Sequence, residues 1–392
     1  AGNLRSAGDV IFDGNFAWSG GRLSGAGRKV NRGTMTMTGI IRGLETGDLR
    51  NEGLAEFNAI RSVPVTAGAQ IVNAAGAIWD IVKDGAVVSS SDGSGNFTND
   101  GELRKSAGSG ESTISRPFVN SGAIRLQAGI LHLASSATQS AGTTQLEGGN
   151  LRTNTFSLSG GLLSGSGTIT GNLTNTGATI RPGSNFGTLT ITGSYTQGAG
   201  GTLEMEIGGA PGSGNVDQLN IGATASLGGS FALAILNGHV SPEAEAHDMV
   251  TYAGRVGEFA VLSGLNPGNG VVYAESYDTD SFTLTAGAAI PEASPVFANS
   301  YGSWTERVAD ERGEWASAPD ADPDGDGRDN LLEYAFSGDP LTPDLDGFPS
   351  ALVTRTGDAR FLLYTYCERG DAIDLRYRLQ QSADLVNWQD SE

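Results

Sequence analysis

Cysteine and histidine are both scarce in this sequence. Its 392 residues include a single cysteine, Cys367, and three histidines. One cysteine excludes an internal disulfide framework and any zinc site built from several cysteines. His132, His239 and His247 belong to no H-E-x-x-H or other paired-histidine pattern, so we expect none of them to have a catalytic or metal-binding role.

Positive charge and long apolar runs are scarce as well. The 44 acidic residues outnumber 24 Lys and Arg, which gives a net charge of −20. Such a chain is repelled by phosphate backbones, so we expect no nucleic-acid partner. Hydrophobic residues never run to the roughly 18 in a row that a membrane-spanning helix needs. The opening AGNLRSAGDV shows no signal peptide and no start methionine, so we expect a removed targeting segment or a piece of a longer protein.

Glycine, by contrast, is abundant, with 59 residues, and it occurs in repeats. SGGRLSGAG at 19–27 returns as SGGLLSGSG at 159–167. A shorter Asn-x-Gly signature, flanked by apolar residues, has its asparagines at Asn31, Asn51, Asn99, Asn120 and Asn175, and Asn73 lies in a related stretch. The smaller separations between these asparagines are 20, 22, 26 and 21 residues. We therefore expect a structural unit of that length, repeated along the chain.

Short runs of alternating apolar and polar residues lie within each unit, for example at 34–38, 123–126, 130–133 and 188–192. This period of two predicts strands that are too short to build separate cores, but that stack coil upon coil into one apolar column. We expect glycine and asparagine at the corners, where positive φ is needed, and asparagine ladders along the column. A disordered Gly/Ser-rich linker is the alternative, which the regular apolar spacing disfavours.

Composition divides the chain into five predicted segments. Residues 1–210 hold the parallel β-helix repeats, and 211–288 the terminal coils and cap, where apolar runs lengthen. Residues 289–299 are a Pro- and Ala-containing linker, and 300–348 a helix-loop-helix segment. Residues 349–392 read as the start of a C-terminal β module, a partial β-sandwich that continues beyond this sequence. The predicted fold class is all-β, with helix confined to the fourth segment.

One motif has a clear chemical meaning. Residues 322–333 fit the pattern D-x-[DN]-x-[DN]-G-x5-E at every position. Calcium takes six to eight oxygen ligands, and carboxylates at loop positions 1, 3, 5 and 12 would repel one another without a cation. The predicted Ca²⁺ ligands are Asp322, Asp324, Asp326, the carbonyl of Arg328, Asn330 and Glu333. An acidic, turn-rich linker is the alternative interpretation.

No catalytic constellation stands out, and we expect no enzymatic activity. Column-shaped β proteins that cleave polysaccharides need two or three acidic groups converging on one face, often with Arg or Lys. The best such cluster is Asp80 and Asp84 around Lys83. A solvated strand end explains this cluster equally well.

Two stretches resemble known families. The run LSGGLLSGSGTITGNLTNTGATIRPGSNFGTLTITGSY within 158–209 resembles repeats near the ends of bacterial autotransporter-type passenger and filamentous-haemagglutinin-like surface proteins. This resemblance implies a right-handed parallel β-helix, exported, with adhesive, matrix or scaffolding roles. DPDGDGRDNLLEYAFSGDP at 322–340, followed by YRLQQSADLVNWQ at 377–389, is similar to thrombospondin type 3/dockerin-like calcium segments, although only one full loop is present where dockerins carry two.

These observations together predict a secreted or cell-surface, adhesin-like structural protein whose C-terminal junction is ordered by calcium. Its expected partners are a polysaccharide, a host or matrix surface, or other copies of itself. Two alternatives share the predicted fold. One is a polysaccharide lyase or hydrolase of the β-helix type, and the other is a self-assembling extracellular filament subunit.

Overall fold

The computed structural model describes residues 2–58, 63–66, 68–90, 95–267 and 271–288 of the first part of the chain. Beyond these it describes 318, 320–325, 328, 330, 334, 350–356, 359–365, 380–381 and 389–390. The chain divides into two compact units, residues 1–289 and 290–392.

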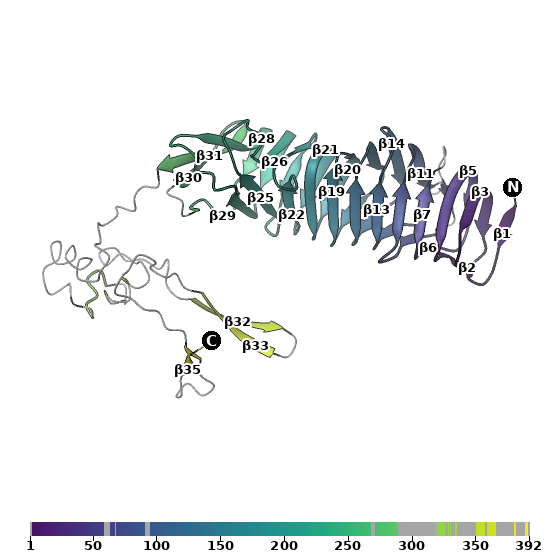
Figure 1. Cartoon of the computed structure of the whole chain (residues 1–392), viewed down its shortest axis with the longest axis horizontal. Helices are drawn as coiled ribbons and strands as arrows, with labels where there is room; N and C mark the ends of the chain where they lie inside the picture. Colours follow the sequence, from purple (N-terminus) through teal and green to yellow (C-terminus); the bar gives the residue numbers. More distant parts are fainter. Residues whose placement is uncertain are drawn as a thin grey trace. The chain divides into compact units, whose positions relative to one another are not determined.

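The first unit is a right-handed parallel β-solenoid of about nine turns, each of which we call a coil (Figure 1). Its 31 strands form one continuous sheet, and every pairing among β1 to β29 is parallel. Each strand pairs with its counterparts one coil before and one coil after. The predicted all-β solenoid, with coils of about 20 residues, is confirmed.

The strands line up in three rows along the column, joined where long strands bend across a corner. The row that carries the asparagines contains β2 (Val10–Phe12), β4 (Lys29–Asn31), β6 (Leu49–Asn51), β9 (Ile71–Asn73), β12 (Phe97–Asn99), β15 (Phe118–Asn120), β18 (Ala137–Gln139) and β24 (Tyr195–Gln197). The second row contains β7 (Leu54–Phe57), β10 (Ile78–Ile81), β13 (Glu102–Lys105), β16 (Ala123–Leu126), β19 (Thr143–Glu147), β22 (Thr179–Pro182), β25 (Thr202–Ile207), β27 (Ser230–Ile235) and β29 (Val261–Ser263). The third contains β1 (Asn3–Arg5), β8 (Val63–Val65), β11 (Gly85–Ser90), β14 (Glu111–Ser115), β17 (Ile130–Leu133) and β23 (Thr188–Ile191). The strands that span corners are β3 (Phe16–Ser24), β5 (Thr34–Leu44), β20 (Asn150–Leu158), β21 (Leu162–Asn175), β26 (Gln218–Leu227) and β28 (Ala246–Gly257).

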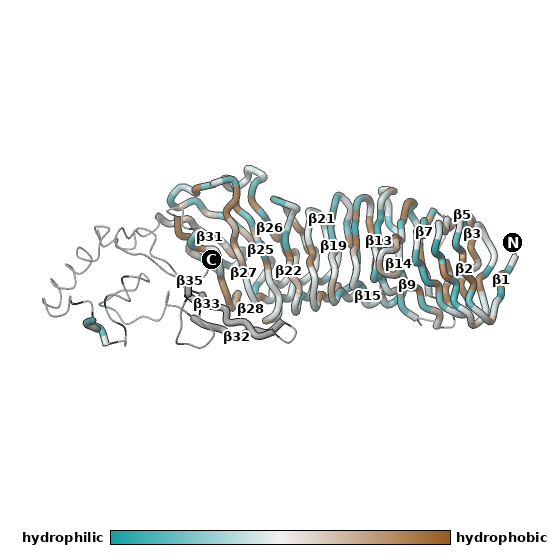
Figure 2. Tube along the Cα trace, turned by 60° about the horizontal axis from the view of Figure 1, so that its bottom comes forward, coloured by the Kyte–Doolittle hydropathy of each residue, from teal (hydrophilic) through white to brown (hydrophobic). Residues whose placement is uncertain are grey.

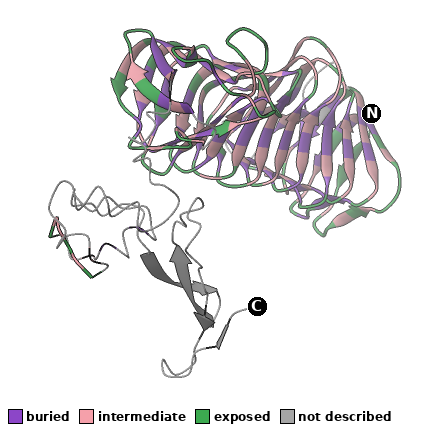
Figure 3. Ribbon diagram, turned by 60° about the vertical axis from the view of Figure 1, so that its left-hand side comes forward, coloured by how far each residue is buried: buried purple, intermediate pink, exposed green. Residues whose placement is uncertain are grey.

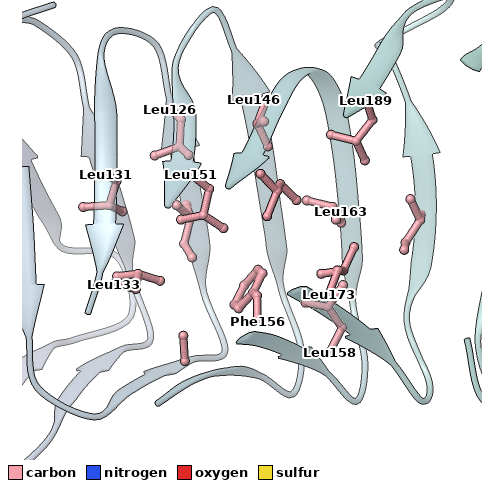
Figure 4. Packing of buried hydrophobic residues seen from close by; sticks show 14 of the residues in the cluster. Leu126, Leu131, Leu133, Leu146, Leu151, Phe156, Leu158, Leu163, Leu173 and Leu189 are labelled. Atoms are coloured by element: carbon pink, nitrogen blue, oxygen red, sulfur yellow. The ribbon is translucent and has the colours of Figure 1, made fainter. Parts of the chain in front are cut away.

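The core is a continuous column of side chains from all three rows. Strands such as β16 and β17 alternate half-buried and buried residues, as predicted (Figures 2 and 3). Parallel register places each inward residue over its counterpart, for example Trp79 over Leu103 and Leu103 over Ile124. Figure 4 shows the resulting leucine stacks, to which Phe156 adds an aromatic ring. Burying each such side chain contributes roughly 1.5–3 kcal/mol, so adjacent coils stabilise one another.

A ladder of buried amides runs along one corner of the column. The Nδ2 atom of Asn31 donates to Oδ1 of Asn51 at 2.7 Å, and the same bond continues through Asn73 and Asn99 to Asn120 at 2.7–2.8 Å. These five side chains are at most 1% exposed. The predicted asparagine ladder is therefore confirmed, but not at positive φ. In the described residues only Asn237 and Ala244 among non-glycines have positive φ.

The glycine of the Asn-x-Gly motif is required chiefly by close packing between coils. A Cβ added to Gly122 would lie 2.1 Å from the carbonyl oxygen of Gly101, one coil below. A Cβ added to Gly53 would likewise lie 2.2 Å from the carbonyl oxygen of Gly33. The expected reason, positive φ, holds at other glycines such as Gly142, at +70°.

The sheet becomes antiparallel only in the pairings made by its last strand. β28 continues the parallel stacking on β26, and then pairs antiparallel with β31 (Ser281–Ala288), which also pairs antiparallel with β30 (Val271–Tyr277). Phe282 in β31 packs against Phe231 and Phe259 at centroid distances of 5.0 and 5.2 Å. This antiparallel hairpin gives the last parallel coils a hydrogen-bonding partner at this end of the column.

The second unit contains two antiparallel pairs. β32 (Ser350–Thr356) pairs with β33 (Ala359–Thr365), and β34 (Gln380–Gln381) with β35 (Gln389–Asp390). Both pairs lie within residues 349–392, where a β module is predicted. Asn330 and Tyr334 have helical backbone. The predicted linker at 289–299 and most of the predicted helix-loop-helix segment at 300–348 lie outside the described residues, and these two segments and the β-sandwich stay predictions.

Candidate functional site

Four of the six predicted calcium ligands lie in the described part of the loop. Oδ1 of Asp322 accepts the backbone N–H of Gly325 at 2.8 Å, which closes a tight turn. Gly325 has a φ of +79°, a conformation that favours glycine. Asn330 is fully buried, and its Nδ2 donates to the carbonyl oxygen of Ala318 at 2.7 Å.

The donor set of this loop suits a hard cation, because carboxylate, amide and carbonyl oxygens are the ligands calcium takes. The turn at Asp322 and Gly325 curls the acidic segment as a calcium loop requires. Asp324 and Arg328 are described as well, whereas Asp326 and Glu333 lie outside the described residues. The calcium site accordingly stays a prediction.

The two carboxylates of the cluster at residues 80–84 form hydrogen bonds with different partners. Asp80 accepts hydrogen bonds from Arg104 Nε at 2.8 Å and from Ser106 Oγ at 2.6 Å. Asp84 instead accepts from Lys105 Nζ at 2.8 Å and from the backbone N–H of Gly110 at 2.9 Å. These bonds lower the pKa of the Asp84 carboxyl, the one from Lys105 most. Among the described residues, no contact joins Asp80, Asp84 and the exposed Lys83, so each carboxylate serves to tie neighbouring coils together.

His132 lies on the lateral surface, as part of an ion-paired row. Its Nδ1 is 2.9 Å from Oε1 of Glu111, whose Oε2 accepts from Arg152 at 2.9 Å. The three side chains come from adjacent strands of one row, β14, β17 and β20. His132 therefore contacts a neighbouring coil through Glu111.

The other two histidines converge with an acid and a hydroxyl near the end of the solenoid. His239 and Glu245 lie in the connection between β27 and β28, and His247 is the second residue of β28. Their ligand atoms, two imidazole nitrogens and a carboxylate oxygen, all lie within 4.8 Å of one another. Ser241, from the same connection, and Tyr273, from β30, complete the cluster.

The distances within this cluster are short. Oε1 of Glu245 is 3.0 Å from Nε2 of His247 and 3.4 Å from Nε2 of His239. Oγ of Ser241 is 3.1 Å from Nε2 of His247 and 3.2 Å from Nε2 of His239. The same Oγ lies 2.9 Å from the hydroxyl of Tyr273. His247 is completely buried, whereas the side chains of His239 and Glu245 are 17% and 14% exposed.

Burial sets the protonation of these groups. It lowers the pKa of His247, although the neighbouring Glu245 charge opposes the effect. For Glu245, burial alone would raise the pKa, but hydrogen bonds from Ser241 and His239 and the charge of His247 bring it below its ordinary value. Burial also raises the pKa of Tyr273. At neutral pH Glu245 is therefore a carboxylate that faces the neutral imidazole of His247, with hydroxyl groups beside it.

The order of contacts excludes a serine-protease-like relay in this cluster. In such a relay the serine contacts one imidazole nitrogen and the acid contacts the other. Here Ser241 and Glu245 both face Nε2 of His247. The cluster instead brings together nitrogen and oxygen atoms that face one another and can act as metal ligands.

Sequence reasoning missed this convergence, because the three residues form an H-x5-E-x-H pattern of no established meaning. The signal was available only in part, since Glu245 and His247 are two apart and point the same way along an extended segment. His239 is brought close to these two residues by the way the connection between β27 and β28 folds back. Asn237, at a φ of 55°, and Ala244, at 65°, reverse its direction.

No protein-family model matches the chain, and no curated protein matches it. Among the described residues, no helix has the length and apolar character to cross a membrane.

Proposed function

We propose that this chain is a secreted or cell-surface structural protein of adhesin type, which displays a rigid β-solenoid, and that it has no enzymatic activity. The observation that carries the proposal is the buried amide ladder of the described column. Each asparagine donates to the next coil and also to a backbone carbonyl, as Asn99 does to Ala123 at 2.9 Å. These bonds fix the spacing and rotation of successive coils, as a passive rod requires.

The charged surface supports the same interpretation. Ion pairs join different coils along the lateral faces. Arg125 pairs with Glu147 in the next coil at 2.7 Å, and Arg152 pairs with Glu111 two coils away at 2.9 Å. Arg181 and Glu204 form a further pair. Side chains that pair between coils reinforce the column and give it a regular polar exterior. Such an exterior suits contact with a polysaccharide, a host or matrix surface, or another copy of the chain.

Two measurements test the display role. Antibody raised against the purified chain should label intact cells that produce it, or its secreted matrix, and labelling found only after lysis would contradict the proposal. The purified chain should release neither reducing ends nor unsaturated sugars from a panel of acidic and neutral polysaccharides. Sustained product release would contradict the structural role and indicate a lyase or hydrolase. End-to-end fibres in electron microscopy would indicate a filament subunit.

Calcium is proposed to order the loop at residues 322–333, because the four carboxylates at loop positions 1, 3, 5 and 12 repel one another without a cation. Limited proteolysis of the full chain should cut within 300–345 more rapidly in EDTA than in millimolar Ca²⁺. An Asp322→Ala variant should be cut rapidly in both buffers. Asp13→Ala, which removes a 75% exposed carboxylate outside the loop, is the matched control. Equal cutting with and without Ca²⁺ would refute the role of calcium and leave the scaffold proposal standing.

A further inference from the structure

The geometry points to a second metal site, of zinc type, formed by His239, Glu245 and His247 at the end of the solenoid. Nε2 of each histidine and Oε1 of the glutamate would bind the ion, with the Ser241 hydroxyl or a water in the fourth position. This site is separate from the predicted calcium loop in both sequence and donor chemistry.

The separations between donor atoms are those of a tetrahedral site. Around a zinc ion with bonds of about 2.0–2.1 Å, tetrahedral ligand atoms lie roughly 3.4 Å from one another. Glu245 Oε1 is 3.4 and 3.0 Å from the two Nε2 atoms, and Ser241 Oγ is 3.2 and 3.1 Å from the same two atoms. One ring nitrogen of each histidine lies within 4.8 Å of the other and of a Glu245 carboxylate oxygen. An ion therefore needs only a small outward shift of these side chains.

The donors are also held in place and partly accessible. His247 is fixed by complete burial in β28, and Ser241, 3% exposed, is held by the hydroxyl of Tyr273 at 2.9 Å. His239 and Glu245 are partly exposed, so an ion can enter from their side. A site with fixed inner donors and open outer ones loses little conformational freedom when an ion binds.

The donor types select the class of ion. Two imidazole nitrogens and one carboxylate oxygen suit zinc and its transition-metal neighbours, whereas calcium requires six to eight oxygen atoms. A bound ion would join the connection between β27 and β28 to β28 itself, next to β30. It would therefore cross-link and stabilise the antiparallel end of the solenoid.

Metal binding to the full chain tests the proposal. Zn²⁺ is titrated calorimetrically in buffer that already contains millimolar Ca²⁺, so that the acidic loop is occupied, and Co²⁺ is titrated in parallel by visible absorption. We expect one tight ion per chain, an intense tetrahedral Co²⁺ spectrum and a raised melting temperature with Zn²⁺. His239→Gln should weaken Zn²⁺ binding by more than about tenfold, since even residues that only orient ligands contribute about that much.

His132→Gln is the matched control, because it removes the one histidine outside the cluster. This variant and Cys367→Ser should bind Zn²⁺ as the wild type does. Glu245→Gln provides a second variant if His239→Gln unfolds, which far-UV circular dichroism would reveal. The proposal is overturned if no ion binds, if both cluster variants bind normally, or if His132→Gln or Cys367→Ser abolishes binding.

Discussion

Replacing Asn99 by aspartate changes a single NH₂ group to an oxygen within the amide ladder. The Asn99 side chain is fully buried and accepts from Asn73 Nδ2 at 2.7 Å. Its own Nδ2 donates to Asn120 Oδ1 at 2.7 Å, to Ala123 O at 2.9 Å and to Gly101 O at 3.3 Å. In Asn99→Asp the accepted bond survives. The amide has two N–H groups for its three acceptors, whereas a protonated carboxyl has one O–H, so at least one donated hydrogen bond is lost and its acceptor faces an oxygen.

Losing one donor and leaving a buried acceptor unsatisfied costs about 1–3 kcal/mol, and ionisation of the buried carboxyl would add to this cost. The variant carboxyl should stay protonated in the folded state, because burial among acceptors raises its pKa above the roughly 3.9 of an unfolded aspartate. The free energy of unfolding should therefore fall further as the pH rises above about 4.

Guanidinium unfolding followed by far-UV circular dichroism measures this loss, at pH 5 and at pH 7.5. Asn154→Asp is the matched control, since it introduces the same charge at an exposed position of β20. We expect the control to stay within about 0.5 kcal/mol of the wild type. If Asn99→Asp is equally mild at both pH values, the ladder does not hold the coils together, and the rigid-rod argument fails with it.

Three further predictions concern the same column. Gly122→Ala should destabilise the fold by about 1–3 kcal/mol in the same unfolding assay, because its Cβ meets a backbone oxygen at 2.1 Å, whereas Gly14→Ala, with open space around it, should be neutral. Burial raises the pKa of Asp217 to about 8, so the folded protein retains a proton that the unfolded chain loses near pH 4. The free energy of unfolding should therefore fall between pH 5 and 8, and Asp217→Asn should make it depend less on pH in that range. Arg125→Ala removes one exposed ion pair and should change stability by less than about 1 kcal/mol, so a larger loss by thermal melting would contradict the assignment of stability to the interior.

The fold could be predicted from the sequence because its determinants repeat. Asparagine spacing gave the length of the coil, and period-two alternation gave the strands. The pattern failed where a different residue occupies the same position. Between Asn120 and Asn175 the row continues through Gln139 and Leu158, and Gln139 still accepts from Asn120 at 3.1 Å.

Buried cations could not be predicted, because their partners are assembled only by the fold. Lys29 is fully buried, and its Nζ donates to the carbonyl oxygens of Gly25, Gly27 and Thr46 at 2.6–2.7 Å. These carbonyls come from two successive coils. A lysine between short strands ordinarily indicates a solvated position, and nothing local marks this one as interior.

The candidate sites divide in the same way. The predicted calcium loop is contiguous, so its ligands could be proposed from their spacing alone. The cluster around His247 depends on a reversal of the chain after β27 and on Tyr273 from a strand 26 residues further on. Sequence spacing carries no information about such a convergence until the path of the connection is known.

The stacking of coils also has a mechanical consequence. The hydrogen bonds between coils run along the axis of the column, and β1 and β31 lie at opposite ends of it (Figure 1). Tension applied between these ends would pull coils off one at a time instead of shearing the whole sheet. Each coil of roughly 20 residues, which occupies about 4.8 Å of the column, would release about 70 Å of extended chain. The protein would then lengthen in steps under force, and would absorb a sudden pull by releasing one coil after another.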